Sequence, residues 1–137
     1  MGPYPRILTR DEISPRLQSV VASLAERLID GSTTAHKILR EQYSRARLRD
    51  VELTGVGLFA HFEIPADAKR VAPARVIGGC VSMDVEDVLG GAGSLLCVSD
   101  GRINYVEVYM YGSASWPDDP IVLSYLEPEP ISFPTAT

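Results

Sequence analysis

His61 and Glu107 are the two residues of this chain best suited to proton transfer. His61 lies in an alternating stretch among apolar neighbours, and Glu107 lies between tyrosines in a second one. A catalytic histidine needs an orienting partner and a nucleophile within reach. Glu63 and Glu107 are candidate partners, but no spacing requires either to be close to His61. We therefore interpret His61 as a partly buried structural histidine and keep it only as a candidate binding residue.

Glu107 has two interpretations. A buried carboxyl has a raised pKa, which is the property that a general acid needs. A carboxyl that is hydrogen-bonded, or that lies at the rim of the sheet, requires no such function. The second interpretation is the simpler one, so we predict no catalytic residue and keep Glu107 as a candidate binding residue.

The chain has few residues that bind metals or form disulfides. Its two cysteines, Cys80 and Cys97, are too few for a disulfide framework. In a reducing cytoplasm we expect both to be free thiols that fill space as small apolar side chains. His36 and His61 have no metal-type spacing. We expect no metal and no cofactor.

Two segments with turn-type residues are of functional interest. Gly90-Gly91-Ala92-Gly93 has the glycines of a phosphate loop, but neither a helix start nor a lysine follows, so we predict a turn there. Trp116-Pro117-Asp118-Asp119 combines a large aromatic ring with two acids, as recognition loops do. The favoured alternative is that Trp116 folds back over the core while the aspartates cap a turn. Trp116 remains a candidate binding residue.

Composition and charge narrow the class of protein. The chain has 137 residues, of which 45% are hydrophobic and 23% charged, as in one soluble globular domain. The net charge of −5 argues against a nucleic-acid partner. No apolar run approaches the roughly 20 residues of a bilayer span, and residues 1–6 have no apolar core behind a basic head, so we expect neither a membrane partner nor a signal peptide. The expected location is the cytoplasm.

Residues 8–48 are predicted to form a helical hairpin. Apolar residues recur at steps of three and four from Ile13 to Leu28, which places them on one stripe of a helix. Gly31 lies where a left-handed residue would end that helix. A second helix follows Ser32-Thr33-Thr34, and the short link makes the two helices antiparallel.

The start of the first helix is ambiguous in the sequence. Thr9 and Glu12 fit a capping box, which would begin the helix early. Pro15 would then lie in the helix interior, where it costs a hydrogen bond. We therefore prefer Ser14 as the N-cap and Pro15 as the first helical residue.

From Asp50 the apolar period changes to two, which predicts an antiparallel sheet of about five or six strands over residues 50–126. Asp100-Gly101 is one of the strongest short hairpin signals. The links between strands are too short for a crossover helix, which argues against a parallel sheet. Residues 127–137 contain three prolines and are predicted to be an extended, mobile tail. The fold class is a single α+β domain over residues 1–137, with the helical hairpin on one face of the sheet.

Both faces of the hairpin around Asp100-Gly101 are predicted to be apolar. If the turn has two residues, alternation separates a tyrosine face from an aliphatic face. The tyrosine face comprises Leu96, Val98, Ile103, Tyr105, Glu107, Tyr109 and Tyr111, and the aliphatic face comprises Leu95, Cys97, Val106, Val108 and Met110. A helical hairpin covers only one face, and the aliphatic face is the natural choice.

Three explanations account for a second apolar face. The sheet curls and buries the tyrosine face on itself, the face pairs with a second copy or another protein, or it lines a small-molecule pocket anchored by Glu107. The candidate binding residues are Tyr105, Glu107, Tyr109, Tyr111, Trp116 and His61.

Part of the sequence resembles a family of small bacterial proteins of unknown function, with a TGVGFF…F-x-VP stretch and a DG…EGYTY…WP second half. The similar stretches are Leu53–Phe59, Phe62–Pro65, Asp100-Gly101, Glu107–Tyr111 and Trp116-Pro117. The resemblance covers roughly residues 38–120. It implies no catalytic motif. In size and acidity, such proteins resemble the antidotes of bacterial toxin systems.

These observations predict a non-enzymatic, cytoplasmic protein-binding module, such as an immunity-like or regulatory partner. Its contact surface would be the tyrosine face and the Trp116 loop, and its negative charge would speed association with a basic partner. Two alternatives stay open. One is a small-molecule binder or enzyme with a pocket around Glu107 and His61, and the other is a homodimer formed through the tyrosine face.

Overall fold

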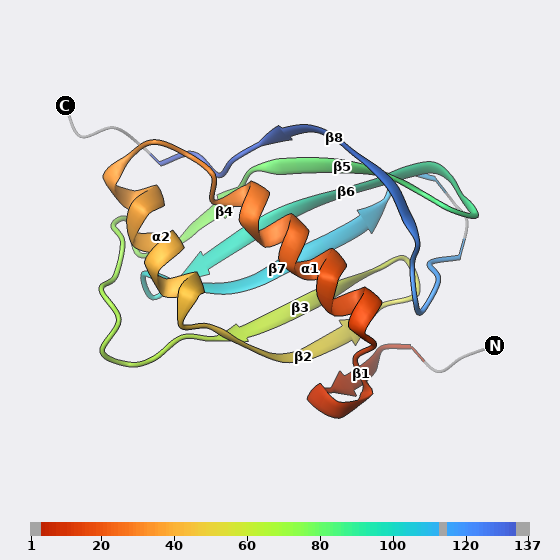
Figure 1. Ribbon diagram of the computed structural model, residues 1–137, viewed down its shortest axis with the longest axis horizontal. Coiled ribbons are helices and arrows are strands. Elements are labelled where there is room, and N and C mark those ends of the chain that lie inside the picture. Colours follow the sequence, from red (N-terminus) through yellow and green to blue (C-terminus); the bar gives the residue numbers. More distant parts are fainter. Residues whose placement is uncertain (1–3, 113–114, 134–137) are drawn as a thin grey trace.

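The structure confirms an α+β fold built on an antiparallel sheet. The computed structural model describes residues 4–112 and 115–133, which form two α-helices and eight strands. Both helices lie in front of the sheet in Figure 1. The strands are β1 (Arg6–Thr9), β2 (Arg47–Leu53), β3 (Gly57–Glu63), β4 (Val76–Gly78), β5 (Cys80–Val85), β6 (Val88–Ser99), β7 (Arg102–Met110) and β8 (Val122–Glu129), and the helices are α1 (Pro15–Leu28) and α2 (Thr34–Ser44).

The order of strands in the sheet is β1-β2-β3-β7-β6-β5-β8, and β4 pairs with β6. The prediction of about five or six strands is therefore too low. The missed strands are β1, with four residues, and β4, with three, and neither is long enough to show a clear period of two. Because β1 precedes α1, the helical segment also begins later than the predicted residue 8.

Both predicted helix starts exist, but they belong to different helices. Ser14 caps α1 by accepting a backbone hydrogen bond at 3.0 Å, and Pro15 is the first helical residue, as predicted. Glu12 accepts a hydrogen bond from the Thr9 backbone N–H at 3.0 Å, and this closes the capping box of a short 3-10 helix, Arg10–Glu12. That helix ends before the proline, so the two signals do not conflict.

Gly31 does not end α1 in the left-handed conformation that we predicted. The C-cap is Ile29, with a φ of −107°, and Gly31 is not among the described residues with positive φ. Gly31 is needed for close packing, because a Cβ atom there would lie 2.3 Å from the His36 ring. A distant segment satisfies the end of the helix, since the Ile131 N–H donates to the Leu28 carbonyl at 2.8 Å.

The segment after β8 is fixed to the helices. β8 itself continues through Glu129, beyond the predicted strand end at Leu126. Ile131 is 1% exposed, and its carbonyl accepts a hydrogen bond from Nε2 of His36. The predicted extended tail therefore begins later than residue 127, and residues 134–137 lie outside the described residues.

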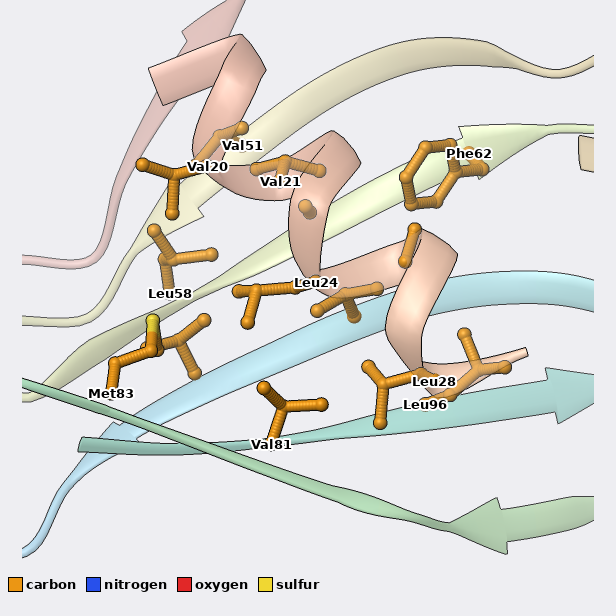
Figure 2. Packing of buried hydrophobic residues seen from close by; sticks show 14 of the residues in the cluster. Val20, Val21, Leu24, Leu28, Val51, Leu58, Phe62, Val81, Met83 and Leu96 are labelled. Atoms are coloured by element: carbon orange, nitrogen blue, oxygen red, sulfur yellow. The ribbon is translucent and has the colours of Figure 1, made fainter. Parts of the chain in front are cut away.

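The core lies between α1 and the sheet. Val20, Val21, Leu24 and Leu28 of α1 point towards side chains from several strands (Figure 2). Those side chains include Val51, Leu58, Phe62, Val81, Met83 and Leu96. Burying one such aliphatic side chain stabilises the fold by about 1.5–3 kcal/mol. Within the part of the chain that the structure describes, neither helix is long and apolar enough to cross a bilayer.

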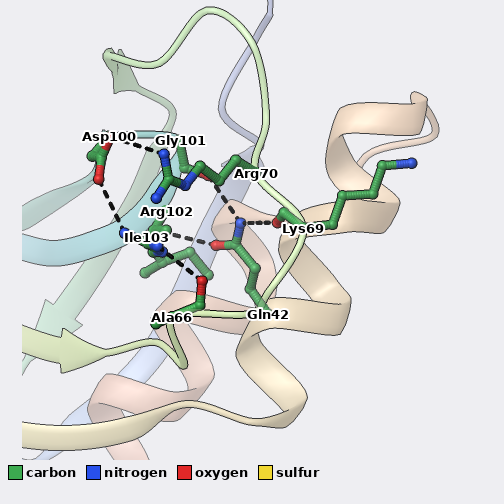
Figure 3. A network of polar contacts seen from close by, with 8 residues as sticks. All are labelled: Gln42, Ala66, Lys69, Arg70, Asp100, Gly101, Arg102 and Ile103. Carbon is green, nitrogen blue, oxygen red and sulfur yellow. Dashed lines mark hydrogen bonds and ion pairs between the residues drawn. The ribbon is translucent and has the colours of Figure 1, made fainter.

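A buried glutamine holds α2 against the β6–β7 turn (Figure 3). Gln42 is 1% exposed. Its Nε2 donates to the carbonyls of Lys69 at 2.8 Å and Gly101 at 2.9 Å, and its Oε1 accepts from the Ile103 backbone N–H at 2.9 Å. One side chain thus connects a helix, the loop after β3 and the hairpin turn.

The Asp100-Gly101 turn is confirmed, but the register beside it differs from the predicted one. Asp100 and Gly101 have φ values of +53° and +71°, as a type I′ turn requires. A β-bulge close to the turn then shifts the pairing by one residue, so that Leu96 lies opposite Val106 and not opposite Tyr105. Because a one-residue shift exchanges the two faces of a strand, Leu96 belongs to the helix-covered face.

The turn predicted at Gly90–Gly93 lies elsewhere. β6 already begins at Val88, and the turn before it contains Asp87, with a φ of +64°. Gly90 and Gly91 have φ values of +87° and +74°, which favour glycine at an irregular place in a strand. A Cβ atom at Gly93 would lie 2.5 Å from the Tyr111 hydroxyl. The glycines therefore shape a strand and make room for tyrosine rings.

Candidate functional site on the open face of the sheet

We call the side of the sheet away from α1 and α2 the open face. Residues directly opposite each other in neighbouring strands share a face, so the register defines the rows that cross it. One row is Ile7, Glu52, Phe59, Glu107 and Leu95, and the next is Thr9, Asp50, His61, Tyr105, Cys97 and Ile77. Among residues 4–112 and 115–133, both α-helices lie on the other side (Figure 1).

Five of the predicted binding residues come together on the open face. They are His61, Tyr105, Glu107, Tyr109 and Tyr111. The Tyr105 ring packs edge-on against Phe59, with 5.2 Å between ring centroids, and the Tyr109 ring packs in the same way against Tyr111, at 5.8 Å. The first four residues are partly exposed and Tyr111 is 53% exposed, so the sheet does not bury this face on itself within the described residues.

The corrected register removes three apolar residues from the predicted tyrosine face. Leu96, Val98 and Ile103 are at most 3% exposed and belong to the core. Leu95 and Cys97 take their place, opposite Glu107 and Tyr105. The aliphatic residues Val106, Val108 and Met110 face the helices, as predicted.

Trp116 does not join the group on the open face. It is 4% exposed and lies in the core cluster, so it contacts no partner in this conformation. The two acids beside it bind the N-terminal part of the chain. Asp118 pairs with Arg6 at 2.7 Å, and Asp119 accepts a hydrogen bond from the Ser14 hydroxyl at 2.6 Å. These contacts anchor the loop to the N-terminal part of the chain.

The orienting partner of His61 is Asp50, which sequence reasoning missed. The Asp50 carboxylate lies 2.7 Å from Nδ1 of His61 and 2.8 Å from Nε of Arg49. Burial acts to raise the pKa of Asp50, but the hydrogen bonds and charges of Arg49 and His61 outweigh it and hold the pKa below its ordinary value. The register of the β2–β3 hairpin could have predicted this pair. If Leu53 lies opposite Leu58, counting three residues back along β2 and three forward along β3 places Asp50 opposite His61.

The His61–Asp50 pair lacks the third member of a nucleophilic site. Among the described residues, no serine, threonine or cysteine side chain hydrogen-bonds to His61. Its ring stacks with Phe59, with 6.4 Å between ring centroids, and packs edge-on against Tyr105 at 5.9 Å. This arrangement fixes the imidazole as part of an aromatic surface and does not place it against a reacting group.

Glu107 lies in apolar surroundings at the centre of the open face. Its cross-strand neighbours are Phe59 and Leu95, and Tyr105 and Tyr109 flank it along β7. Burial raises the pKa of Glu107 above its ordinary value. Among the described residues, its carboxylate has no ion pair within 4.0 Å and no hydrogen bond within 3.5 Å. The charge is therefore partly desolvated without a protein partner.

This burial makes stability depend on pH in a testable way. The pKa of Glu107 in the folded state is raised above the ordinary value of 4.5, so the folded protein holds the carboxyl proton more tightly than the unfolded chain does. The contribution of Glu107 to the free energy of unfolding therefore falls as pH rises from the pKa of the unfolded state through the pKa of the folded state. Glu107→Gln should therefore gain stability relative to wild type between about pH 4 and pH 7. Urea unfolding at both pH values measures the gain, and a loss over that range would contradict it.

The central rows of the open face carry three acids, Asp50, Glu52 and Glu107. On rows further out, Glu63 lies opposite Arg47, and Asp84 lies on β5. Arg49 is paired with Asp50. The sign of this surface agrees with the net charge of −5 of the whole chain.

A hollow of about 570 Å³ lies at the β5–β8 edge of the open face. Its lining residues are Cys80, Ser82, Tyr111, Leu126, Glu127 and Glu129. The Tyr111 hydroxyl is 2.8 Å from the Ser82 hydroxyl, at the side of the hollow nearest the aromatic cluster. Glu107 is not among these lining residues, so this hollow differs from the predicted pocket around Glu107.

No protein-family model, curated protein or solved structure matches the chain. The resemblance to the small bacterial family therefore stays a prediction.

Proposed function

We propose that this chain is a non-enzymatic protein-binding module of the cytoplasm that holds a basic partner protein on its open face. One observation carries the proposal. The helices cover one side of the sheet, and the other side presents an aromatic centre with Asp50, Glu52 and Glu107 on its two central rows. Tyrosine and phenylalanine are enriched in protein interfaces, and partly exposed aromatic clusters of this kind are typical of recognition surfaces.

The charge of the open face favours a basic partner over a second copy of the chain. In a two-fold symmetric dimer the same patch meets itself, so Glu52, Glu107 and Asp50 of one copy would face the same three acids of the other. Like charges brought together across an interface weaken it by several kcal/mol. A partner with a positive surface removes that cost and gains in association rate.

The proposal is tested by removing the aromatic centre without unfolding the sheet. Tyr105 and Tyr109 are replaced together by serine. Tyr4→Ser is the matched control, because Tyr4 is 45% exposed and contacts Asp118 and Gly55 instead of the open face. Wild type and Tyr4→Ser are expected to retain a basic protein from native extract, and the double variant is expected to lose it. Circular dichroism verifies that each variant is folded.

Salt and sedimentation measurements complete the test. The dissociation constant for the captured protein is expected to rise with ionic strength, because opposite charges on the two surfaces attract less when they are screened. A partner that binds the double variant as tightly as wild type would contradict the proposal. Sedimentation compares the mass of wild type with that of the double variant. A dimer for wild type and a monomer for the double variant would also contradict the proposal, because the open face would then bind a second copy of the chain.

The small-molecule alternative now rests on the hollow beside Tyr111. A ligand there would contact Ser82 and the glutamates of β8. Thermal unfolding of the protein with a panel of small polar and cationic compounds measures this function directly. Stabilisation that disappears in Ser82→Ala and persists in the Tyr105/Tyr109 double variant would favour it.

A further inference from the structure

We infer that Glu107 and the rings around it form a seat for one arginine side chain of the partner. The inference rests on the proposed function and names the chemistry of its central contact. The guanidinium group would lie over the ring of Tyr105, Tyr109 or Phe59 and pair with the Glu107 carboxylate. Among the residues that the structure describes, the nearest neighbours of Glu107 on the open face include no other charged residue.

The first argument is the position of Glu107. Glu107 lies between Phe59 of β3 and Leu95 of β6 in the register of the sheet. Tyr105 and Tyr109 lie two residues before and after it on β7. The Phe59 and Tyr105 rings already contact each other, with 5.2 Å between their centroids. The carboxylate therefore belongs to a residue with aromatic neighbours on the central strand of the sheet, away from its edges.

The second argument is the missing counter-charge. Within the described residues three aspartates form ion pairs with arginines: Asp50 with Arg49, Asp118 with Arg6, and Asp119 with Arg16. Glu107 has none, although Arg75 is near enough to Tyr105 for its charge to lower the pKa of that phenol against the stronger effect of burial. An unpaired, partly buried carboxylate costs stability, and a residue that costs stability is typical of a binding function.

The third argument selects arginine from the cations. Its planar guanidinium stacks on aromatic rings while its N–H groups pair with a carboxylate, whereas a lysine ammonium is compact and strongly hydrated. The chain contains an example of this contact on its other face, where the Arg27 guanidinium lies 4.2 Å from the centroid of the Tyr125 ring. The open face offers rings and a carboxylate together, which is the combination that arginine uses.

The experiment uses a defined peptide in place of the unidentified partner. The full-length chain is titrated with acetyl-Gly-Arg-Gly-Arg-Gly-amide, followed by NMR. The same peptide with citrulline, the neutral isostere of arginine, is the ligand control. Glu107→Gln tests the seat. Glu52→Gln is the protein control, because it removes the same charge from the same row, opposite Phe59.

The expected result is specific in position and in charge. The arginine peptide should shift signals of Phe59, Tyr105, Glu107 and Tyr109, and should bind about tenfold more tightly than the citrulline peptide. Glu107→Gln should abolish that difference, and Glu52→Gln should keep most of it. Equal binding of the two peptides, shifts that map elsewhere, or unchanged affinity in Glu107→Gln would overturn the inference.

The captured partner separates this inference from the proposed function. If Glu107→Gln weakens partner binding about as much as loss of Tyr105 and Tyr109, both stand. If only the tyrosine double variant weakens it, the module binds its partner without an arginine seat, and the inference falls alone. If neither substitution changes partner binding, both fall.

Discussion

Replacing Gln42 by alanine is expected to lower the free energy of unfolding by about 3 kcal/mol. The side chain makes three hydrogen bonds to backbone groups of Lys69, Gly101 and Ile103. Because Gln42 is 1% exposed, the substitution leaves the buried Ile103 N–H without a partner, which costs about 1–3 kcal/mol. It also removes a donor from the carbonyls of Lys69 and Gly101 and leaves a cavity. Urea unfolding at neutral pH measures the loss.

Two further variants determine whether the network causes the effect. Glu41→Ala changes the preceding, exposed residue of α2 and should alter stability by less than about 0.5 kcal/mol. Gln42→Glu keeps the shape and the acceptor for Ile103, but it places a charged oxygen against the carbonyls of Lys69 and Gly101. It should destabilise the protein at neutral pH at least as much as alanine does. A Gln42→Ala variant within 1 kcal/mol of wild type, roughly the value of one hydrogen bond, would contradict the role given to the network.

Gly57→Ala is expected to lower the free energy of unfolding by about 3 kcal/mol, for a steric reason. A Cβ atom at Gly57 would lie 1.8 Å from the Val108 carbonyl oxygen and 2.7 Å from its carbonyl carbon. Both are backbone atoms of the neighbouring strand, so no side-chain rotation relieves the contact. The pair of β3 with β7 must separate locally, and Tyr109 lies directly opposite Gly57. The open face should therefore be disturbed as well.

Gly78→Ala is the matched control for this prediction. Gly78 also lies in a strand, has no positive φ, and its nearest neighbour to an added Cβ is 3.8 Å away, at an Ile131 side-chain carbon. Alanine there should leave stability within about 0.5 kcal/mol of wild type. Thermal and urea unfolding of both variants decide the question. Equal losses would show that the general cost of losing a strand glycine, and not the clash with Val108, is measured.

The sequence by itself determined the local signals of the fold. Three features follow from residue types and their periodicity: the Ser14-Pro15 start of α1, the Asp100-Gly101 turn, and the division of β7 into tyrosine and aliphatic sides from Tyr105 to Met110. Each depends on interactions within a few residues, such as a side chain that caps its own helix or a turn that only certain φ values allow. The α+β class followed because links between strands were too short for crossover helices.

The tertiary structure alone decided which residues meet. A bulge in the β6–β7 hairpin moved Leu96 into the core and Cys97 onto the open face, because one extra residue exchanges the faces of a strand without changing the hydrophobic pattern much. Gln42 is buried because α2 packs against a turn that is about 60 residues later in the sequence. The two segments are close enough in space for hydrogen bonds. Trp116 is buried in the core and does not belong to the open face. Its burial depends on packing between segments that are distant in the sequence, and alternation within one strand does not encode that packing.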